Sequence, residues 1–125
     1  MNFTFKKQER LCSKKLIDEV FSKGKSISKF PFKLVFLQTD LNTGFPIQVG
    51  FSVPKKYIKK AVDRNLIKRK MREAYRLNKH LFYQDLNEKD RHYAAFLIYL
   101  SKEQLTFEQI EDKTNFLFDR LVKMT

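Results

Sequence analysis

The 125-residue sequence predicts a single-domain α+β sandwich, with a small mixed sheet packed with helices in the order αββαβα. Three observations predict it: two stretches in which apolar and polar residues alternate, one continuous apolar run, and three stretches with helical apolar spacing. Hydrophobic residues make up 42% of the chain, which is enough to close one core at this length. We therefore expect residues 1–125 to form one domain.

The first predicted helix begins after Ser13 and ends at Gly24. Serine caps helix N-termini, and glycine commonly ends helices. Apolar residues recur between the two with helical spacing, at Leu16, Ile17, Val20 and Phe21. The segment therefore predicts a short amphipathic helix.

Two strands are expected next, over residues 32–37 and 47–53. Both show the two-residue apolar alternation of a strand with one buried face. Residues 40–46 between them have a turn-like composition, so we expect the two strands to pair antiparallel. Pro54 ends the second strand because proline has no N–H to donate to a ladder.

The longest predicted helix runs from about Tyr57 to Lys79. Ile67, Met71 and Ala74 form its apolar stripe, at positions i, i+4 and i+7. This stripe predicts that one side of the helix packs on the core.

The last third of the chain predicts one strand and one helix. The continuous apolar run from Tyr93 to Leu100 is typical of a strand that is buried on both faces. Thr106 and Gln109 then form a capping box, which marks the start of the final helix. Apolar residues follow at helical spacing, and these elements complete the αββαβα order.

Charge is concentrated in one segment of the chain. The 26 Lys and Arg against 14 Asp and Glu give a net charge of +12, and residues 55–79 hold eleven of the basic residues against two acidic ones. Such an imbalance indicates a polyanionic partner, nucleic acid before a membrane surface. No apolar run approaches the roughly 18 residues of a membrane span, and residues 1–10 lack the apolar core of a secretory signal. We expect a cytoplasmic protein without a membrane partner.

The long helix has a cationic side opposite its apolar stripe. At 100° per residue this side carries Arg64, Asn65, Lys68, Arg69, Arg72, Arg76 and Lys79. Like charges at i, i+4 cost about 0.2 to 0.5 kcal/mol each, and an anion offsets that repulsion. Arginine also matches phosphate oxygens in a bidentate way, and Asn65 can address a base edge or a sugar hydroxyl. A solvated charged face is the alternative, but the scarcity of acidic partners favours phosphate binding.

Residues for protein-based catalysis are scarce. The chain has one cysteine, Cys12, and two histidines, His80 and His92. No Asp/Glu pair or His/Cys/Asp cluster has recognisable catalytic or metal-binding spacing. We therefore expect no catalytic residue and no metal ligand in the protein.

The segment Val49–Arg76, VGFSVPKKYIKKAVDRNLIKRKMREAYR, closely resembles the signature region of the bacterial ribonuclease P protein component. The family pattern is V-G-x-S-V-x-K-K at a strand end, followed by A-V-x-R-N-x-x-K-R-x-x-R-E on a helix. Nearly every fixed position is met. The resemblance extends upstream to Arg10 and Leu11 and downstream to the last helix, so it covers almost the whole chain.

This resemblance implies the protein subunit of a ribonucleoprotein endoribonuclease that removes the 5′ leader from precursor tRNA. The family's RNA subunit performs the hydrolysis, so the protein is expected to bind no cofactor alone, with Mg²⁺ acting through the RNA. The implied partners are ribonuclease P RNA and precursor tRNA, and the protein without RNA is expected to be monomeric. The implied fold has a left-handed βαβ crossover, an exception to the usual right-handed preference.

The resemblance also implies two RNA-binding surfaces. The catalytic RNA is expected on the basic helix, at Arg64, Asn65, Lys68, Arg69 and Arg72. The single-stranded leader is expected in a cleft between the first helix and the sheet, at Ile17, Phe21, Val35, Ser52, Lys55 and Lys56.

Three positions depart from the family pattern. Leu66 stands where an arginine is usual, so one bond to phosphate is missing or is replaced by Lys70, one turn on. Ile17 and Val35 stand where aromatic residues are expected, so base stacking should contribute less here. Phe21 keeps its ring, either as a stacking residue or as part of the core.

Two other functions stay open at this point. One is a ribosomal or ribosome-biogenesis protein that uses the same basic helix on structured RNA. The other is a DNA-binding regulator, although residues 40–46 and the strands around them give no helix-turn-helix.

Overall fold

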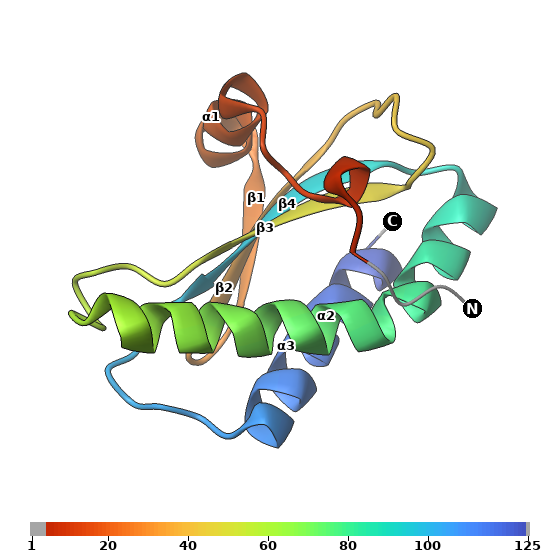
Figure 1. The fold of residues 1–125 in the computed structure, drawn as a ribbon. Coiled ribbons are helices and arrows are strands. Elements are labelled where there is room, and N and C mark those ends of the chain that lie inside the picture. The colour runs from red at the N-terminus through yellow and green to blue at the C-terminus, as the bar shows by residue number, and fades with distance from the viewer. Residues whose placement is uncertain (1–4, 125) are drawn as a thin grey trace.

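The computed structural model describes residues 5–124 and contains four strands and three α-helices in that range (Figure 1). In chain order the elements are the 3₁₀ helix η1 (Lys7–Glu9), α1 (Lys14–Lys23), β1 (Lys25–Lys29), β2 (Phe32–Gln38), β3 (Ile47–Ser52), α2 (Ala61–Lys89), β4 (Tyr93–Tyr99) and α3 (Phe107–Lys123). The predicted α+β class is confirmed, and β1 is an addition to the predicted order. No helix within the described residues is long and apolar enough to cross a membrane.

The strands form one mixed sheet in the order β1-β2-β4-β3. β1 with β2 and β2 with β4 are antiparallel, whereas β3 and β4 are parallel and are connected through α2. The predicted antiparallel pairing of residues 32–37 with 47–53 was therefore wrong. β4 lies between those two strands because its apolar side chains suit a central strand buried on both faces.

The strand that the sequence did not predict is β1, at the edge of the sheet. Its sequence is KSISK, and only Ile27 is buried while the other four residues are exposed. A single apolar residue gives no visible alternation. The flanking Lys25 and Lys29 are typical of an edge strand that must not pair with another chain.

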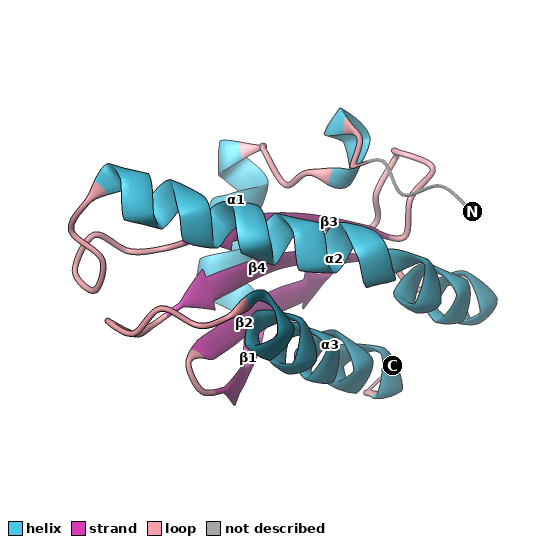
Figure 2. Cartoon of the chain, turned by 60° about the horizontal axis from the view of Figure 1, so that its bottom comes forward, coloured by secondary structure: helices cyan, strands magenta, loops and turns pink. Residues whose placement is uncertain are grey.

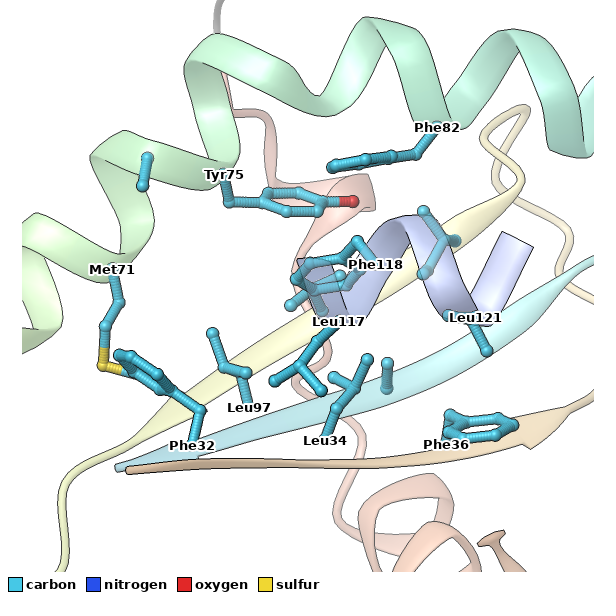
Figure 3. Close-up of a cluster of buried hydrophobic side chains, with 14 of the residues drawn as sticks. Phe32, Leu34, Phe36, Met71, Tyr75, Phe82, Leu97, Leu117, Phe118 and Leu121 are labelled. Carbon is cyan, nitrogen blue, oxygen red and sulfur yellow. The ribbon is translucent and has the colours of Figure 1, made fainter. Parts of the chain in front are cut away.

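Helices cover both faces of the sheet, with α1 on one side and α2 and α3 on the other (Figures 1 and 2). The larger core lies under α2 and α3. Figure 3 shows Phe32 of β2 next to Met71 of α2, while Leu34 of β2 and Leu97 of β4 point toward Tyr75 of α2 and Phe118 of α3. α2 and α3 also pack against each other, so they form one layer over the sheet.

The ends of α1 and α3 follow the predicted caps. Ser13 Oγ accepts a hydrogen bond from the Leu16 N–H at 3.3 Å, and the Thr106–Gln109 capping box makes both of its bonds, at 3.0 and 3.2 Å. At the end of α1, a Cβ on Gly24 would lie 2.6 Å from the Phe36 carbonyl oxygen. Glycine therefore lets the chain turn closely against β2.

The long helix differs from its predicted range at both ends. It starts at Ala61 and continues to Lys89, because Phe82 and Leu86 extend the buried stripe beyond Lys79. It ends where Asp90 adopts a left-handed conformation, with φ of 52°. The N-terminal half carries most of the basic side chains, and the C-terminal half also packs on the N-terminal segment.

Candidate nucleic-acid interface

The first candidate surface is the N-terminal half of α2. Ile67, Met71 and Ala74 are buried beneath it, as predicted. On the solvent side lie Asn65, Arg69 and Arg72, which are exposed, and Arg64 and Lys68, which are half-buried. We call these five residues, Arg64, Asn65, Lys68, Arg69 and Arg72, the basic face. They lie within about the first three turns of the helix.

Arg64 also orders the loop that precedes α2. Its Nη1 donates to the carbonyl oxygens of Ile58 and Lys59, at 3.0 and 2.7 Å. These bonds tie Ile58 and Lys59 to the first turn of α2. Lys55 and Lys56 of this loop are exposed and extend the positive surface beyond the basic face.

Two cations of the predicted cationic side have other partners. Arg76 pairs with Glu73, which lies one turn earlier on α2, and its Nε lies 3.1 Å from Glu73 Oε2. This hydrogen bond lowers the pKa of Glu73. Lys79 was predicted on the cationic side, but it is only 3% exposed because the N-terminal segment packs over it and supplies Glu9 as its partner.

Leu66, which departs from the family pattern, and Lys70, its expected substitute in binding phosphate, point in different directions from α2. Leu66 is exposed on the outside of α2. Lys70 Nζ lies 3.4 Å from the carbonyl oxygen of Leu105, toward the loop before α3.

The second candidate surface lies between α1 and the sheet. The buried layer beneath α1 consists of Leu11, Val20, Val35 and Ala94. Val35 is 6% exposed, so the structure places this predicted cleft residue within the packed layer rather than on an open surface. Ile17 is half-buried at the margin of the layer.

An aromatic pair forms the open part of this surface. Phe21 of α1 is 50% exposed, and its ring centroid lies 5.3 Å from that of Phe96 on β4. Phe96 lies between Val35 on β2 and Gly50 on β3. A Cβ on Gly50 would come within 2.6 Å of the Phe96 ring, so glycine makes room for the ring at this point.

Phe96 is the residue that sequence reasoning missed. It lies inside the continuous apolar run, where nothing distinguishes it from its neighbours. Gly50 on the adjacent strand leaves room for a large side chain beside it. This points to Phe96 only once β3 and β4 are known to be paired. Phe96 supplies an aromatic ring next to Val35, the position at which the family pattern led us to expect one.

Ser52 lies on the α1 side of the sheet. Val53 is buried in the core under α2, and Phe51 packs against that core from a partly buried position. Ser52 is paired with Ile98, whose side chain belongs to the layer beneath α1. The surface between α1 and the sheet is therefore formed by Ile17, Phe21, Ser52 and Phe96, and we call it the α1–sheet surface.

A cavity of about 300 Å³ joins the two surfaces. Its walls include Lys68 and Arg72 of the basic face and Ile17, Gly50 and Phe96 beside α1, together with the N-terminal segment. The cavity has cationic side chains on one side and apolar ones on another. This combination suits a nucleotide, which has an anionic phosphate and a flat apolar base.

No group of three or more His, Cys, Asp or Glu side chains within residues 5–124 is arranged to hold a metal ion. Cys12 is a free, exposed thiol. His92 Nδ1 accepts a hydrogen bond from the Leu41 N–H at 3.3 Å, at the end of the sheet where β4 begins.

Known proteins are similar to this chain in sequence and in fold. The ribonuclease P family model matches residues 5–122. A ribonuclease P protein component from Porphyromonas gingivalis is 35% identical over 109 residues, which cover 87% of this chain and 80% of that protein. Its counterpart from Finegoldia magna is 35% identical over 105 residues, which cover 84% and 83%.

Solved structures of ribonuclease P proteins have a similar fold. The ribonuclease P protein of Thermotoga maritima matches with a TM-score of 0.72 at 26% identity, covering 90% of this chain and 96% of that chain. The Staphylococcus aureus protein has the same fold, with a TM-score of 0.72 at 21% identity, covering 90% and 94%. The chain therefore belongs to the ribonuclease P protein component family, and it is an RNA-binding subunit of that ribonucleoprotein in tRNA processing, with ribonuclease P RNA as its partner.

Proposed function

We propose that the basic face binds the catalytic RNA, while the α1–sheet surface binds the 5′ leader of precursor tRNA. The observation that carries this division is the cavity of about 300 Å³ between the two surfaces, with Lys68 and Arg72 on one side and Ile17 and Phe96 on another. A leader strand that enters it lies next to the RNA held on α2. The protein thereby helps the catalytic RNA to distinguish precursor from mature tRNA, because mature tRNA has no leader to fill the cavity.

The basic face suits a structured RNA backbone. Its exposed arginines, Arg69 and Arg72, present planar forks that pair with phosphate oxygens, and the exposed Asn65 carries an amide that both donates and accepts hydrogen bonds. Arg64 ties Ile58 and Lys59 to α2, and the exposed Lys55 and Lys56 precede them at the edge of the same positive surface. They lie just beyond Ser52, where a leader strand leaving the α1–sheet surface meets positive charge.

The α1–sheet surface suits a single strand. Bases of a single strand are free to stack on aromatic rings, and Phe21 offers half of its surface while contacting Phe96. Ile17 offers an aliphatic contact only, so the aromatic share of leader binding comes from these two rings.

In this proposal the RNA subunit carries out phosphodiester hydrolysis, and the magnesium ions that it needs are held by RNA phosphates. The side chains of the protein that face the RNA are mainly Lys and Arg. These side chains donate hydrogen bonds but, charged at neutral pH, supply no general base. The protein binds no cofactor on its own, is a monomer without RNA and works in the cytoplasm.

Reconstitution tests the proposal. Purified protein is mixed with a bacterial ribonuclease P RNA and 5′-labelled precursor tRNA at low magnesium, and release of the leader is followed over time. We expect the protein to stimulate leader release and to bind the precursor more tightly than mature tRNA. Stimulation that is equal for all leader lengths would contradict the role of the α1–sheet surface. No stimulation by an RNA that is active alone at high magnesium would contradict the proposed function.

A further inference from the structure

The N-terminal segment, residues 6–12, is a wall of the cavity between the two RNA-binding surfaces. Arg10, Leu11 and Cys12 line it, across from α2 and α1. Arg10 is exposed and Leu11 is buried, so the segment offers a cation to the cavity and an apolar side chain to the packed layer. Its position therefore affects the shape of the cavity.

One anchor ties this segment to the edge of the sheet. The Leu11 N–H donates to the Val49 carbonyl oxygen at 3.1 Å, and Gln48 Nε2 donates to the Gln8 carbonyl oxygen at 3.1 Å. β3 is the edge strand here, so the segment covers part of an otherwise unpaired edge. These are two neutral hydrogen bonds, which are individually weak.

The second anchor is a buried ion pair with α2. Glu9 is 0% exposed, and its Oε1 accepts hydrogen bonds from Lys79 Nζ and, at 2.6 Å, from Tyr83 Oη. Its Oε2 accepts the Lys6 N–H at 2.7 Å, so both carboxylate oxygens are bonded. Breaking a buried pair leaves an unpaired charge away from water, which is far more costly than losing a surface pair.

Lys79 is therefore a cation of the basic helix that faces inward. It follows Arg72 by two helical turns and would continue the positive surface, but it lies under the N-terminal segment. Its charge is neutralised by Glu9 and is not free to attract phosphate.

We propose that Glu9 and Lys79 are positioning residues of the RNA interface. Their ion pair fastens the N-terminal segment to α2 and so holds Arg10 at the cavity, beside Lys68 and Arg72, where it contacts RNA phosphate. This inference rests on the proposed function, because it assigns the cavity to RNA. Neither Glu9 nor Lys79 touches RNA itself.

The single cysteine of the chain allows a direct test of whether the ion pair attaches the N-terminal segment to α2. A nitroxide spin label on Cys12 reports the motion of the segment in the free protein, without RNA. The variants are Glu9→Gln, Lys79→Met and the milder Tyr83→Phe. Glu73→Gln is the matched control, because it removes the same charge from a partly exposed ion pair on α2.

We expect the label to be restricted in the wild-type protein and in Glu73→Gln. It should become mobile in Glu9→Gln and Lys79→Met, and partly so in Tyr83→Phe, at temperatures where circular dichroism shows that each variant is folded. A label in Glu9→Gln that is as restricted as in the wild type would overturn the proposal. If Glu9→Gln and Lys79→Met do not fold, Tyr83→Phe decides the question by the same criterion.

RNA-binding measurements distinguish a positioning role of the ion pair from a general loss of stability. In holoenzymes made with ribonuclease P RNA, we expect Glu9→Gln to raise the dissociation constant for precursor tRNA about tenfold, and Glu73→Gln to change it by no more than about twofold. Arg10→Ala should weaken binding in the wild-type background but have little further effect in the Glu9→Gln background, because Arg10 is already displaced there. Additive penalties, or a mobile label with unchanged RNA affinity, would overturn the proposal. A wild-type holoenzyme that fails to release leader would instead count against the proposed function, and the spin label would still test the fastening.

Discussion

The basic face and the α1–sheet surface recognise RNA by different physics. The basic face is local in sequence: four cationic side chains and Asn65 lie within nine positions of one helix. The α1–sheet surface is built from α1, β3 and β4, and its open part is an aromatic pair with a glycine beneath it. The first attracts any phosphate backbone, whereas the second requires an unpaired strand with accessible bases.

This difference separates affinity from discrimination. Phosphate contacts are strong, depend on salt and are largely insensitive to sequence. Stacking depends on whether a base is free, which is the property that distinguishes a leader from a folded tRNA. Variants of the two surfaces should therefore differ in salt dependence and in leader dependence.

The largest effect is expected from the residue that supports the basic face. Ile67 is 2% exposed beneath it, so Ile67→Ala should lower the free energy of unfolding by about 2 to 5 kcal/mol. Urea denaturation measures this decrease. Because no charge is removed, the variant that remains folded should keep the wild-type salt dependence of RNA binding. A reduced salt slope would mean that Ile67 affects the interface by more than packing.

On the α1–sheet surface, removing a ring should act on the precursor alone. We expect Phe21→Ala to weaken holoenzyme binding of precursor tRNA by about 1 to 3 kcal/mol and to leave mature tRNA binding unchanged. Phe96→Ala should have the same selectivity, because its ring supports that of Phe21. Equal weakening of both tRNAs, together with a lower melting temperature, would make Phe21 a core residue.

On the basic face, removing a charge should change the salt dependence. A side chain that neutralises one RNA phosphate contributes about 0.7 to 0.9 to the slope of log K against log salt. We therefore expect Arg72→Ala and Lys68→Ala each to weaken binding to ribonuclease P RNA and to flatten the slope by about that amount. Binding titrations over a range of salt concentrations measure it. Unchanged slopes in both variants would remove the basic face from the interface.

Adding a ring where the family pattern has one should have a smaller effect in the opposite direction. Ile17 is half-buried at the cavity, next to Phe96. Ile17→Phe should strengthen precursor binding by less than the roughly 1 to 3 kcal/mol of a full stacking interaction, because part of the ring is buried on the sheet. Competition binding against the wild type measures the increase in affinity. Equal or weaker binding by a folded Ile17→Phe variant would place this side chain in the core.

The smallest expected effect concerns pH. Burial by itself raises the pKa of Glu9, but hydrogen bonds from Lys79, Tyr83 and the Lys6 N–H outweigh it and hold the pKa below its ordinary value of 4.5. The ion pair therefore stabilises the fold above that pH, and the stabilisation is lost as pH falls through the lowered pKa. Urea midpoints measured from about pH 7 down to pH 3 should fall more steeply in the wild type than in Glu9→Gln. If the urea midpoints of the two proteins fall in parallel with pH, the stabilisation cannot be assigned to the Glu9 carboxylate.

The sequence predicted the features that depend on neighbouring residues. Ser13 and Thr106 cap α1 and α3 as expected, because a cap requires only a short polar side chain within the first turn. The basic face was readable for the same reason, since helical spacing fixes which side chains share a side.

Features that depend on distant residues were not readable. The pairing of β3 with β4 follows from the crossover through α2, and no local pattern distinguishes it from the antiparallel hairpin that was expected. Phe96 became a candidate only after that pairing placed it beside Gly50. Lys79 was misassigned to the solvent side because Glu9, its partner, lies 70 residues away in the chain.

The most direct test of the division between the two surfaces is one binding series. Precursors trimmed stepwise from the 5′ end are bound by holoenzymes that contain wild-type, Phe21→Ala or Arg72→Ala protein at fixed salt. We predict that the Phe21→Ala penalty disappears once the leader is too short to reach the α1–sheet surface. Arg72→Ala should weaken assembly with ribonuclease P RNA in titrations without precursor, and its penalty in the precursor series should remain when the leader is absent. A Phe21→Ala penalty that persists with leaderless tRNA, or an Arg72→Ala penalty that appears only with long leaders, would contradict the account.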